Sequence, residues 1–397
     1  MIALLATSVI TLFATSTAAE EWEYGSGLKS ELTFLHEFVN YEFDPDREHD
    51  WERGLMSASG LRFSYGSTSK HRLFQRHDIL LNTGLGGGWR FMTHVRRYGT
   101  DHRSDDESSA DLGFQKAVVS NISLCVYSDL YHAKDQIDGS IGVLATSVDR
   151  ENYAQVLFVW DDLIWDARNC DGGDSDRLPL GLSWLARYTL GRWEAFTSGK
   201  LSAGFKRRYD DTHLSPDLRY QERRINDASV KLIRRTGDSS RWEAVISHYR
   251  FRDGRRYGDP GRNYDYRNEV THGILRCLLP WRETYRVRLE AHGVGQVRRS
   301  DGFRRFRYER SEVMPAVFVT RSFGRNGVEL GYFGAVYGWD YDDWDDAQDF
   351  SRDDYIDKMK IGWSYAFNKR SWVQMSLSHV VSLSNFGGGN MQYVVMF

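Results

Sequence analysis

Apolar and polar residues alternate along much of this chain, which is the period-two pattern of β-strands. The clearest case is the segment 285–298. One of its faces carries residues that are apolar or small, namely Tyr285, Val287, Leu289, Ala291 and Gly293. The other face carries Arg286, Arg288, Glu290, His292, Gln296 and Arg298, with Val294 as the one apolar exception. The segment therefore predicts a strand with one apolar face and one ionic face.

Two later segments repeat this pattern. In 355–367 the apolar face is interrupted only by Asp357, and the opposite face carries Lys358 and Lys360. In 372–383 apolar residues oppose Gln374, Ser376 and Ser378. The segments 314–320 and 328–339 are apolar or small on both faces. They predict strands as well, but their two faces cannot be assigned from the sequence.

The connections between these segments alternate in length. Short polar breaks occur at 236–241, 280–283, 324–327 and 368–371, and Asn326-Gly327 is a hairpin signal. Longer polar stretches lie at 100–109, 253–262 and 340–354. The glycine-rich segment 83–88 predicts a bulge, a kink or a turn rather than a clean strand.

The last seven residues, 391–397, alternate in the same way and end on an aromatic residue. Met391, Tyr393, Val395 and Phe397 share one face, and no polar tail follows. This ending resembles the closing strand of Gram-negative outer-membrane β-barrels. The resemblance implies that assembly machinery recognises Tyr393, Val395 and Phe397. It also implies that the last strand pairs with the first, which we expect at 28–43.

The other end of the chain predicts a secretory signal. Residues 2–15 form an uncharged apolar run, and Ser16-Thr17-Ala18-Ala19 follows it, so cleavage is expected after Ala18 or Ala19. A single membrane anchor is the alternative, but the run is short for a span of ~20 residues. The predicted organisation is a signal peptide at 1–19 and one barrel domain at 20–397.

Together these features predict an all-β fold, a transmembrane antiparallel up-and-down β-barrel of roughly 16–18 strands in the outer membrane. Short periplasmic turns and long extracellular loops are typical of that class. The mean hydropathy of -0.55 and the 14% aromatic content fit a barrel and a soluble β-rich protein equally well. The 52 basic and 55 acidic residues are interspersed, which gives no basic face for nucleic acid.

The ionic strand faces are the candidate functional residues. An Arg or Lys facing lipid at the membrane midplane costs ~2–4 kcal/mol, so several of them belong inside the barrel. The predicted lumen and selectivity residues are Arg286, Arg288, Glu290, His292, Arg298, Lys358 and Lys360. Further basic residues lie in less certain strands, namely Arg207, Arg208, Arg223, Arg224, Lys231 and Arg250.

Two interpretations of this lumen remain open. In a water-filled pore the charges select solutes. In a closed barrel, Arg and Glu pair and fill the lumen as structure. Because ~16 or more strands leave an aqueous interior, the pore is favoured. We therefore expect a porin-like channel for passive diffusion of small hydrophilic or charged solutes, neither an enzyme nor dependent on a cofactor. The rival is a surface-structural or ligand-binding barrel.

Three further alternatives concern chemistry at single sites. Ser382 and His379 could serve an outer-membrane lipid hydrolase, although their spacing places them on opposite faces of a strand. The acidic stretch 340–354 could bind Ca²⁺, but a solvated acidic loop is the better prediction. The three cysteines, Cys125, Cys170 and Cys277, allow at most one disulfide and show no metal or haem spacing.

The expected partners are outer-membrane lipids, lipopolysaccharide, the barrel-assembly machinery and small polar solutes. Nucleic acid is not expected. A homotrimer and a monomer both remain possible, because no long inward-folding loop can be identified in the sequence.

Overall fold

The computed structural model describes residues 58–69, 72–100, 107–131, 136–148, 150–165, 173–177, 180–209, 218–237, 240–303, 305–344 and 348–397. The predicted signal peptide and the strand expected at 28–43 lie outside these residues. No helix in the described ranges is both long enough and apolar enough to cross a membrane.

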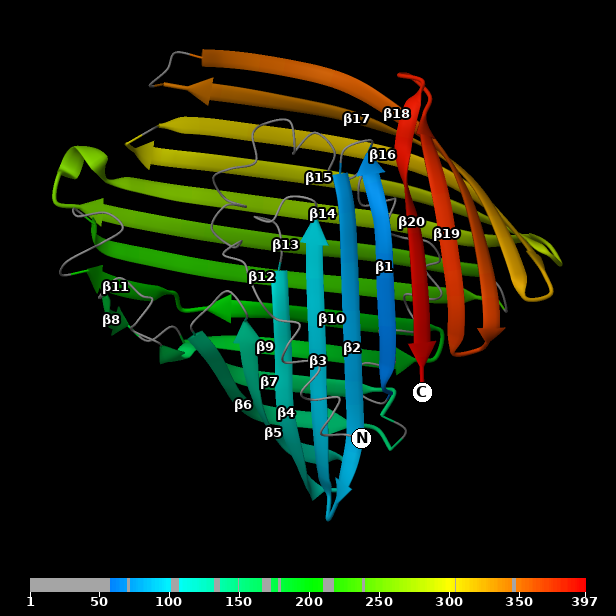
Figure 1. The fold of residues 1–397 in the computed structure, drawn as a ribbon, viewed down its shortest axis with the longest axis horizontal. Helices are drawn as coiled ribbons and strands as arrows, with labels where there is room; N and C mark the ends of the chain where they lie inside the picture. Colours follow the sequence, from blue (N-terminus) through cyan, green and yellow to red (C-terminus); the bar gives the residue numbers. More distant parts are fainter. Residues whose placement is uncertain are drawn as a thin grey trace.

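The described residues form one antiparallel sheet of 20 strand segments (Figure 1). Its first half comprises β1 (Gly60–Ser69), β2 (Arg72–Gly86), β3 (Trp89–Thr100), β4 (Glu107–Val119), β5 (Ile122–Tyr131), β6 (Gln136–Thr146), β7 (Tyr153–Trp165), β8 (Gly173–Arg177), β9 (Leu180–Leu190), β10 (Trp193–Ser202) and β11 (Phe205–Tyr209). Its second half comprises β12 (Leu218–Thr236), β13 (Ser240–Tyr257), β14 (Tyr264–Arg282), β15 (Tyr285–Gly302), β16 (Phe306–Phe323), β17 (Asn326–Asp343), β18 (Gln348–Asn368), β19 (Ser371–Val380) and β20 (Asn385–Met396). The 3-10 helix η3 (Pro260–Arg262) connects β13 to β14.

The sheet closes on itself because β20 pairs with β1, from Gly60 opposite Met396 to Ser67 opposite Gly389. The backbone N–H of Phe397 donates to the Ser59 carbonyl at 2.8 Å, and Ser59 returns a bond of 3.0 Å. β9 and β10 continue as the short segments β8 and β11, which pair with each other. Counted that way, the described residues form a closed barrel of 18 strands. The predicted strand number is confirmed, but β1 takes the place beside β20 that was expected for 28–43.

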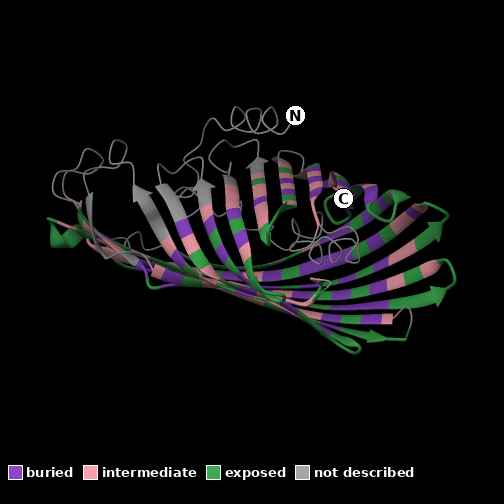
Figure 2. Ribbon diagram, turned by 90° about the horizontal axis from the view of Figure 1, so that it is seen from below, coloured by how far each residue is buried: buried purple, intermediate pink, exposed green. Residues whose placement is uncertain are grey.

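Buried and exposed residues alternate along the strands (Figure 2). Outward residues are apolar and exposed, as Leu275 shows at 64% exposure, whereas its inward neighbour Arg276 is 3% exposed. On the closing strand, Met391, Tyr393 and Phe397 are exposed and Val394 is buried. The predicted strand faces of 285–298 and 391–397 are therefore confirmed. An apolar exterior around a polar interior is the pattern that a membrane barrel requires.

The barrel wall is much longer on one side than on the other. The strands β12–β18, which we call the long-strand wall, have 18–21 residues each, whereas those of β1–β11 have 5–15. In Figure 1 they run as long bands across the direction of β1, β2, β3 and β20. A span of the membrane needs only ~9–11 residues. The long strands therefore extend beyond the membrane, and the polar segments 253–262 and 340–354 are partly strand rather than loop.

Two turns differ in how well the sequence predicted them. The segment 83–88 contains a turn, in which Gly86, Gly87 and Gly88 adopt φ values of 85°, 56° and 77°. Glycine suits these positions because it has no Cβ. The hairpin signal at Asn326-Gly327 was wrong by two residues. The turn is formed by Gly324 and Arg325, with Gly324 at φ 61°, and Asn326 already pairs with Phe323.

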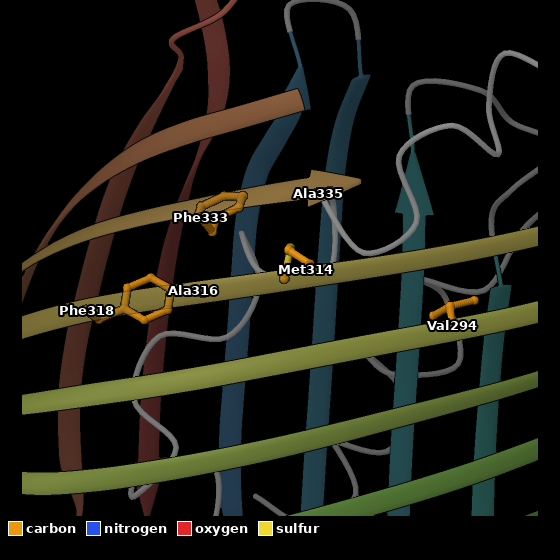
Figure 3. Packing of buried hydrophobic residues seen from close by; sticks show 6 residues of the cluster. All are labelled: Val294, Met314, Ala316, Phe318, Phe333 and Ala335. Atoms are coloured by element: carbon orange, nitrogen blue, oxygen red, sulfur yellow. The ribbon is translucent and has the colours of Figure 1, made fainter. Parts of the chain in front are cut away.

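Packing on the inner wall assigns the two segments whose faces the sequence left open. Val294, Met314, Ala316, Phe318, Phe333 and Ala335 form a buried cluster on β15, β16 and β17 (Figure 3). Phe318 pairs with Gly331, and a Cβ on Gly331 would lie 2.2 Å from the Phe318 ring. The ring can turn inward over β17 because Gly331 has no side chain.

The outer face gives a direct stability prediction at Leu289. This residue faces outward with 45% exposure and pairs with Val317 on β16. We expect Leu289→Arg to lower the free energy of unfolding by about 2–4 kcal/mol, because a guanidinium group would face the hydrocarbon. Unfolding by denaturant in lipid vesicles measures this change. Leu289→Met is the matched control and should be close to neutral. Equal stability of both variants would contradict an outward-facing Leu289.

Candidate functional site

An alternating series of cations and carboxylates crosses the inner face of the long-strand wall. We call it the lumenal charge ladder, and it comprises Lys231, Arg241, Glu243, Arg276, Arg288, Glu290, Glu329 and Lys360. Strand pairing positions its centre, because Arg276 lies directly opposite Glu243 on β13 and Glu290 on β15. Side chains opposite each other in neighbouring strands point to the same face, so the three charges meet inside the barrel.

Glu243 and Arg276 form the first half of the ladder. Arg276 donates from Nη1 to Glu243 Oε1 and from Nε to Glu290 Oε1, each at 2.7 Å. Lys231 Nζ lies 3.6 Å from Glu243 Oε1, and Arg241 Nη2 lies 3.1 Å from Glu243 Oε2. Each carboxylate is thus shared among several cations, which holds both kinds of side chain in fixed positions.

Arg288 joins this half to β17 and β18. Its Nε lies 3.3 Å from Glu290 Oε1, and its Nη2 lies 3.2 Å from Glu329 Oε2. Lys360 Nζ lies 3.7 Å from Glu329 Oε1. β16 contributes Phe318 here, and the Arg288 guanidinium lies 4.0 Å from the centroid of that ring. A cation–π contact of this kind adds to the stabilisation of Arg288.

The ladder contains more cations than carboxylates. Five cations, Lys231, Arg241, Arg276, Arg288 and Lys360, face the three carboxylates of Glu243, Glu290 and Glu329. All but Glu329 are buried. Charges at such sites are stable only when they are paired and hydrogen-bonded. The ladder is therefore a fixed, positively biased feature of the inner wall.

Histidines extend the ladder toward the middle of the wall. The Nε2 of His292 lies 2.9 Å from Glu290 Oε2, and its ring stacks on His272 with centroids 5.9 Å apart. Lys358 also faces inward and is fully buried, and its Nζ donates to the Gly387 carbonyl at 2.6 Å. This lysine connects β18 to β20 across the shorter β19.

The predicted lumen residues separate into two groups. Arg288, Glu290 and Lys360 belong to the ladder, and His292 and Lys358 are buried on the same inner face. Arg298 is half-buried further along β15, with its guanidinium 5.7 Å from the Tyr308 ring, and Arg286 is exposed beside the 283–284 turn. The structure thus joins four of these residues, Arg288, Glu290, His292 and Lys360, in one network. That they set selectivity stays a prediction.

The basic residues that the sequence placed in less certain strands divide between the two faces of the barrel wall. Lys231 and Arg223 face inward, but Arg224 and Arg250 are exposed on the outer face. The cost of an Arg or Lys facing lipid assigns the side chain to the interior only where the strand lies within the membrane. Arg224 and Arg250 lie in the part of the long-strand wall that extends past the apolar band.

Sequence analysis missed the ladder residues Arg241, Glu243, Arg276 and Glu329. Arg276 is surrounded by Ile274, Leu275, Cys277 and Leu278, so no alternation marks its face. Glu329 lies in 328–339, a segment with no polar face of its own. A signal was available, because an isolated charge inside an apolar strand must face the barrel interior if it spans the membrane.

The hydrolase alternative gains no support from the geometry. His379 is exposed on the outer face of β19, and Ser382 lies in the connection to β20. In the described part of the chain no contact joins the two residues. The backbone N–H of Ser382 instead donates to Asp357 Oδ1 at 2.8 Å. Tyr332 Oη donates to Asp357 Oδ2 at 2.9 Å. Asp357, the polar exception on the apolar face of 355–367, therefore accepts hydrogen bonds that hold the end of β19 against β18.

Metal and disulfide chemistry add nothing to this site. Within the described ranges no group of three or more His, Cys, Asp or Glu side chains is placed to hold a metal ion. Cys125 and Cys277 are free and buried, and Cys170 lies outside the described residues. Residues 345–347 of the acidic stretch also lie outside them.

Neither a family model nor a curated protein matches the chain. Solved structures of outer-membrane proteins do match it, at low identity. A bacterial polysaccharide outer membrane secretin is 8% identical, with a TM-score of 0.42 over 86% of this chain and 99% of that one. A loop L8 deletion mutant of OmpT, an outer membrane protein of Vibrio cholerae, is 9% identical, with a TM-score of 0.41 over 86% and 98%.

An anion-selective porin from Comamonas acidovorans is 10% identical, with a TM-score of 0.35 over 86% of this chain and 98% of that one. At these identities the likeness concerns the fold alone. The stronger observations are internal to the chain: pairing of β20 with β1, an apolar outer band and a charged inner wall. The described residues therefore form a closed β-barrel of the outer-membrane type.

Proposed function

We propose that this barrel is a channel for the passive diffusion of small hydrophilic solutes and that it favours anions. The observation that supports this preference is the excess of cations in the lumenal charge ladder. Arginine and lysine side chains that line a pore favour anions, as acidic rings favour cations.

The ladder suits this role because its charges are fixed. Each carboxylate bonds to more than one cation, so the cations do not fold away from the lumen. A charged wall beside a low-dielectric protein layer focuses the field into the aqueous space, which raises the local concentration of the opposite ion. Burial of the individual side chains does not remove this long-range effect.

The test is the reversal potential of the inserted protein in a KCl gradient across a planar bilayer. We expect chloride to permeate better than potassium in the natural chain. Lys360→Gln removes one buried ladder cation, and the reversal potential should shift toward that of a non-selective pore. Lys369→Gln is the matched control, because Lys369 is exposed in the turn between β18 and β19. A cation-selective natural chain would contradict the proposal.

A second candidate function follows from the same ladder. Its charges are paired and mostly buried, which also suits a sealed barrel that serves as a structural or ligand-binding surface protein. The two candidates differ in conductance. If the protein is inserted, as shown by protease protection of its strands, and passes no current above background, the channel is excluded and the sealed barrel is retained.

A further inference from the structure

Five arginines lie side by side on the outer face of the long-strand wall. Arg224 on β12 pairs with Arg252 on β13, Arg252 with Arg267 on β14, Arg267 with Arg299 on β15, and Arg299 with Arg307 on β16. We call these five residues the arginine row. Like charges placed directly opposite each other destabilise a sheet. Negative charge near these five positions would therefore stabilise this part of the sheet.

The described residues supply this counter-charge only in part. Arg252 lies 3.7 Å from Asp265, and Glu309 contacts both Arg299 and Arg307. These pairs are about half exposed, so each contributes little to stability. Arg224 donates from Nε to the Ser202 carbonyl at 2.9 Å. Arg267, in the middle of the row, is exposed and has no bonded partner in the described part of the chain.

The row has clear ends. On one side, Arg224 contacts Ser202 at the break between β10 and β11. On the other side, Arg307 pairs with Asp342 of β17. Neighbouring strands are ~4.8 Å apart, so the row presents five guanidinium groups over ~19 Å. This is a linear, positively charged surface strip rather than a pocket.

The distance of the arginine row from the apolar band of the outer face shows which layer of the membrane surface surrounds it. The last register row with exposed apolar residues runs from Val230 and Ile246 to Val313 and Val336. Arg307 lies six residues beyond Val313 along β16, and Arg252 lies six beyond Ile246. At ~3.4 Å per residue and a tilt of ~45°, the row stands ~14 Å above the apolar band. Phospholipid headgroups extend only ~5–8 Å beyond the hydrocarbon.

The row also lies on the extracellular side. It occupies the half of β12–β16 that is remote from the short turns at 283–284 and 324–325 and from Phe397. Short turns mark the periplasmic end of an outer-membrane barrel. The row therefore lies above the hydrocarbon on the side of the outer leaflet.

We propose that the arginine row binds the phosphate groups on the sugars of lipopolysaccharide. Guanidinium groups form paired hydrogen bonds with phosphate oxygens, and such charge-assisted bonds are about twice as strong as neutral ones. A phosphorylated glycolipid reaches the height of the row, whereas a phospholipid does not. Binding relieves the repulsion along the row and fixes the barrel in the outer leaflet. The proposal does not depend on whether the lumen conducts.

The test is a binding measurement with the refolded, lipopolysaccharide-free barrel in detergent. The double variant Arg267→Glu/Arg299→Glu reverses the charge at the centre of the row. The matched control is Arg325→Glu/Arg370→Glu, which makes the same change in two short turns at the opposite end. The probes are purified lipopolysaccharide, the same material after phosphatase treatment, and vesicles containing phosphatidylglycerol.

We expect the row variant to bind lipopolysaccharide at least tenfold more weakly than the natural chain, which corresponds to about one charge-assisted bond. The turn variant should bind normally. Phosphatase treatment should weaken binding to the natural chain by a similar factor, and phosphatidylglycerol should bind equally weakly to all three proteins. Equal lipopolysaccharide affinity of the row and turn variants would overturn the proposal.

Two other outcomes have a defined meaning. If the row variant alters the oligomeric state of the barrel and leaves lipopolysaccharide affinity unchanged, the row contacts a second copy and the proposal is wrong. If the charge-reversed protein does not refold, Arg267→Gln/Arg299→Gln replaces it, since it removes the charges without adding carboxylates. Heat-modified mobility on gels shows whether each variant has refolded.

Discussion

Replacing Glu290 with glutamine is expected to lower the free energy of unfolding by about 3–5 kcal/mol. Glu290 is the carboxylate that Arg276, Arg288 and His292 share, at 2.7, 3.3 and 2.9 Å. An amide has no charge and presents N–H groups, so the two arginines would lose their common acceptor and repel each other. Removing one partner from a buried ionic cluster costs far more than the cluster itself contributes.

Denaturant unfolding of the barrel in lipid vesicles measures this effect. Glu283→Gln is the matched control, because Glu283 is exposed in the turn between β14 and β15. Its stability should remain within about 0.5 kcal/mol of the natural chain, as for most surface substitutions. If the two variants are equally stable, the buried network around Glu290 does not hold the long-strand wall together. A stable Glu290→Gln barrel would remain useful, since it should be more anion-selective than the natural chain.

Deleting Phe397 is expected to remove most of the correctly inserted protein from the outer membrane. The deletion takes away two backbone hydrogen bonds with Ser59, one accepted and one donated, at the seam where β20 meets β1. It also removes an outward aromatic side chain that is 58% exposed. Because a barrel has no free edge only when this seam is closed, loss at the seam affects assembly more than loss elsewhere.

Heat-modified mobility of membrane fractions measures the inserted amount. Phe397→Ala keeps the two backbone hydrogen bonds with Ser59 but removes the aromatic ring. Comparing it with the deletion shows how much of the loss is due to the ring and how much to the backbone pairing. Phe323→Ala is the positional control, since Phe323 is an exposed aromatic next to a short turn at the same end of the barrel. Full insertion of the deletion variant would contradict both the closing role of β20 and the resemblance to outer-membrane barrels.

Strand faces were predictable where one face is ionic. In 285–298 the alternation identified Arg288, Glu290 and His292 as inward residues, and all three are buried inside the barrel. The sequence left Arg224 and Arg250 unassigned, and both face outward. Period-two alternation shows which residues share a face. The cost of placing an Arg or Lys side chain in hydrocarbon then assigns that face to the barrel interior, but only for the part of the strand within the membrane. The sequence does not show where each long strand leaves the hydrocarbon.

Turn positions were predictable to within two residues. The glycines at 86–88 form a turn, as their number suggested. The Asn326-Gly327 signal marked the right hairpin but the wrong pair. Pairing of Phe323 with Asn326 fixes the turn at Gly324 and Arg325. Register along the whole hairpin outweighs the local preference of one dipeptide, because a shift by one residue would turn every side chain of the strand to the opposite face.

The sequence by itself determined the fold class, the approximate strand number, the closing strand and the face of each strand with clear alternation. These features follow from the alternation of apolar and polar side chains along each strand. That alternation can be read within a single segment, without knowing which segment pairs with it. Only the tertiary structure decided which first strand closes the barrel, how Glu243, Arg276, Glu290 and Glu329 join across strands, and that five arginines share one register row. Those features depend on register between segments, and register is a relation between strands that no single strand encodes.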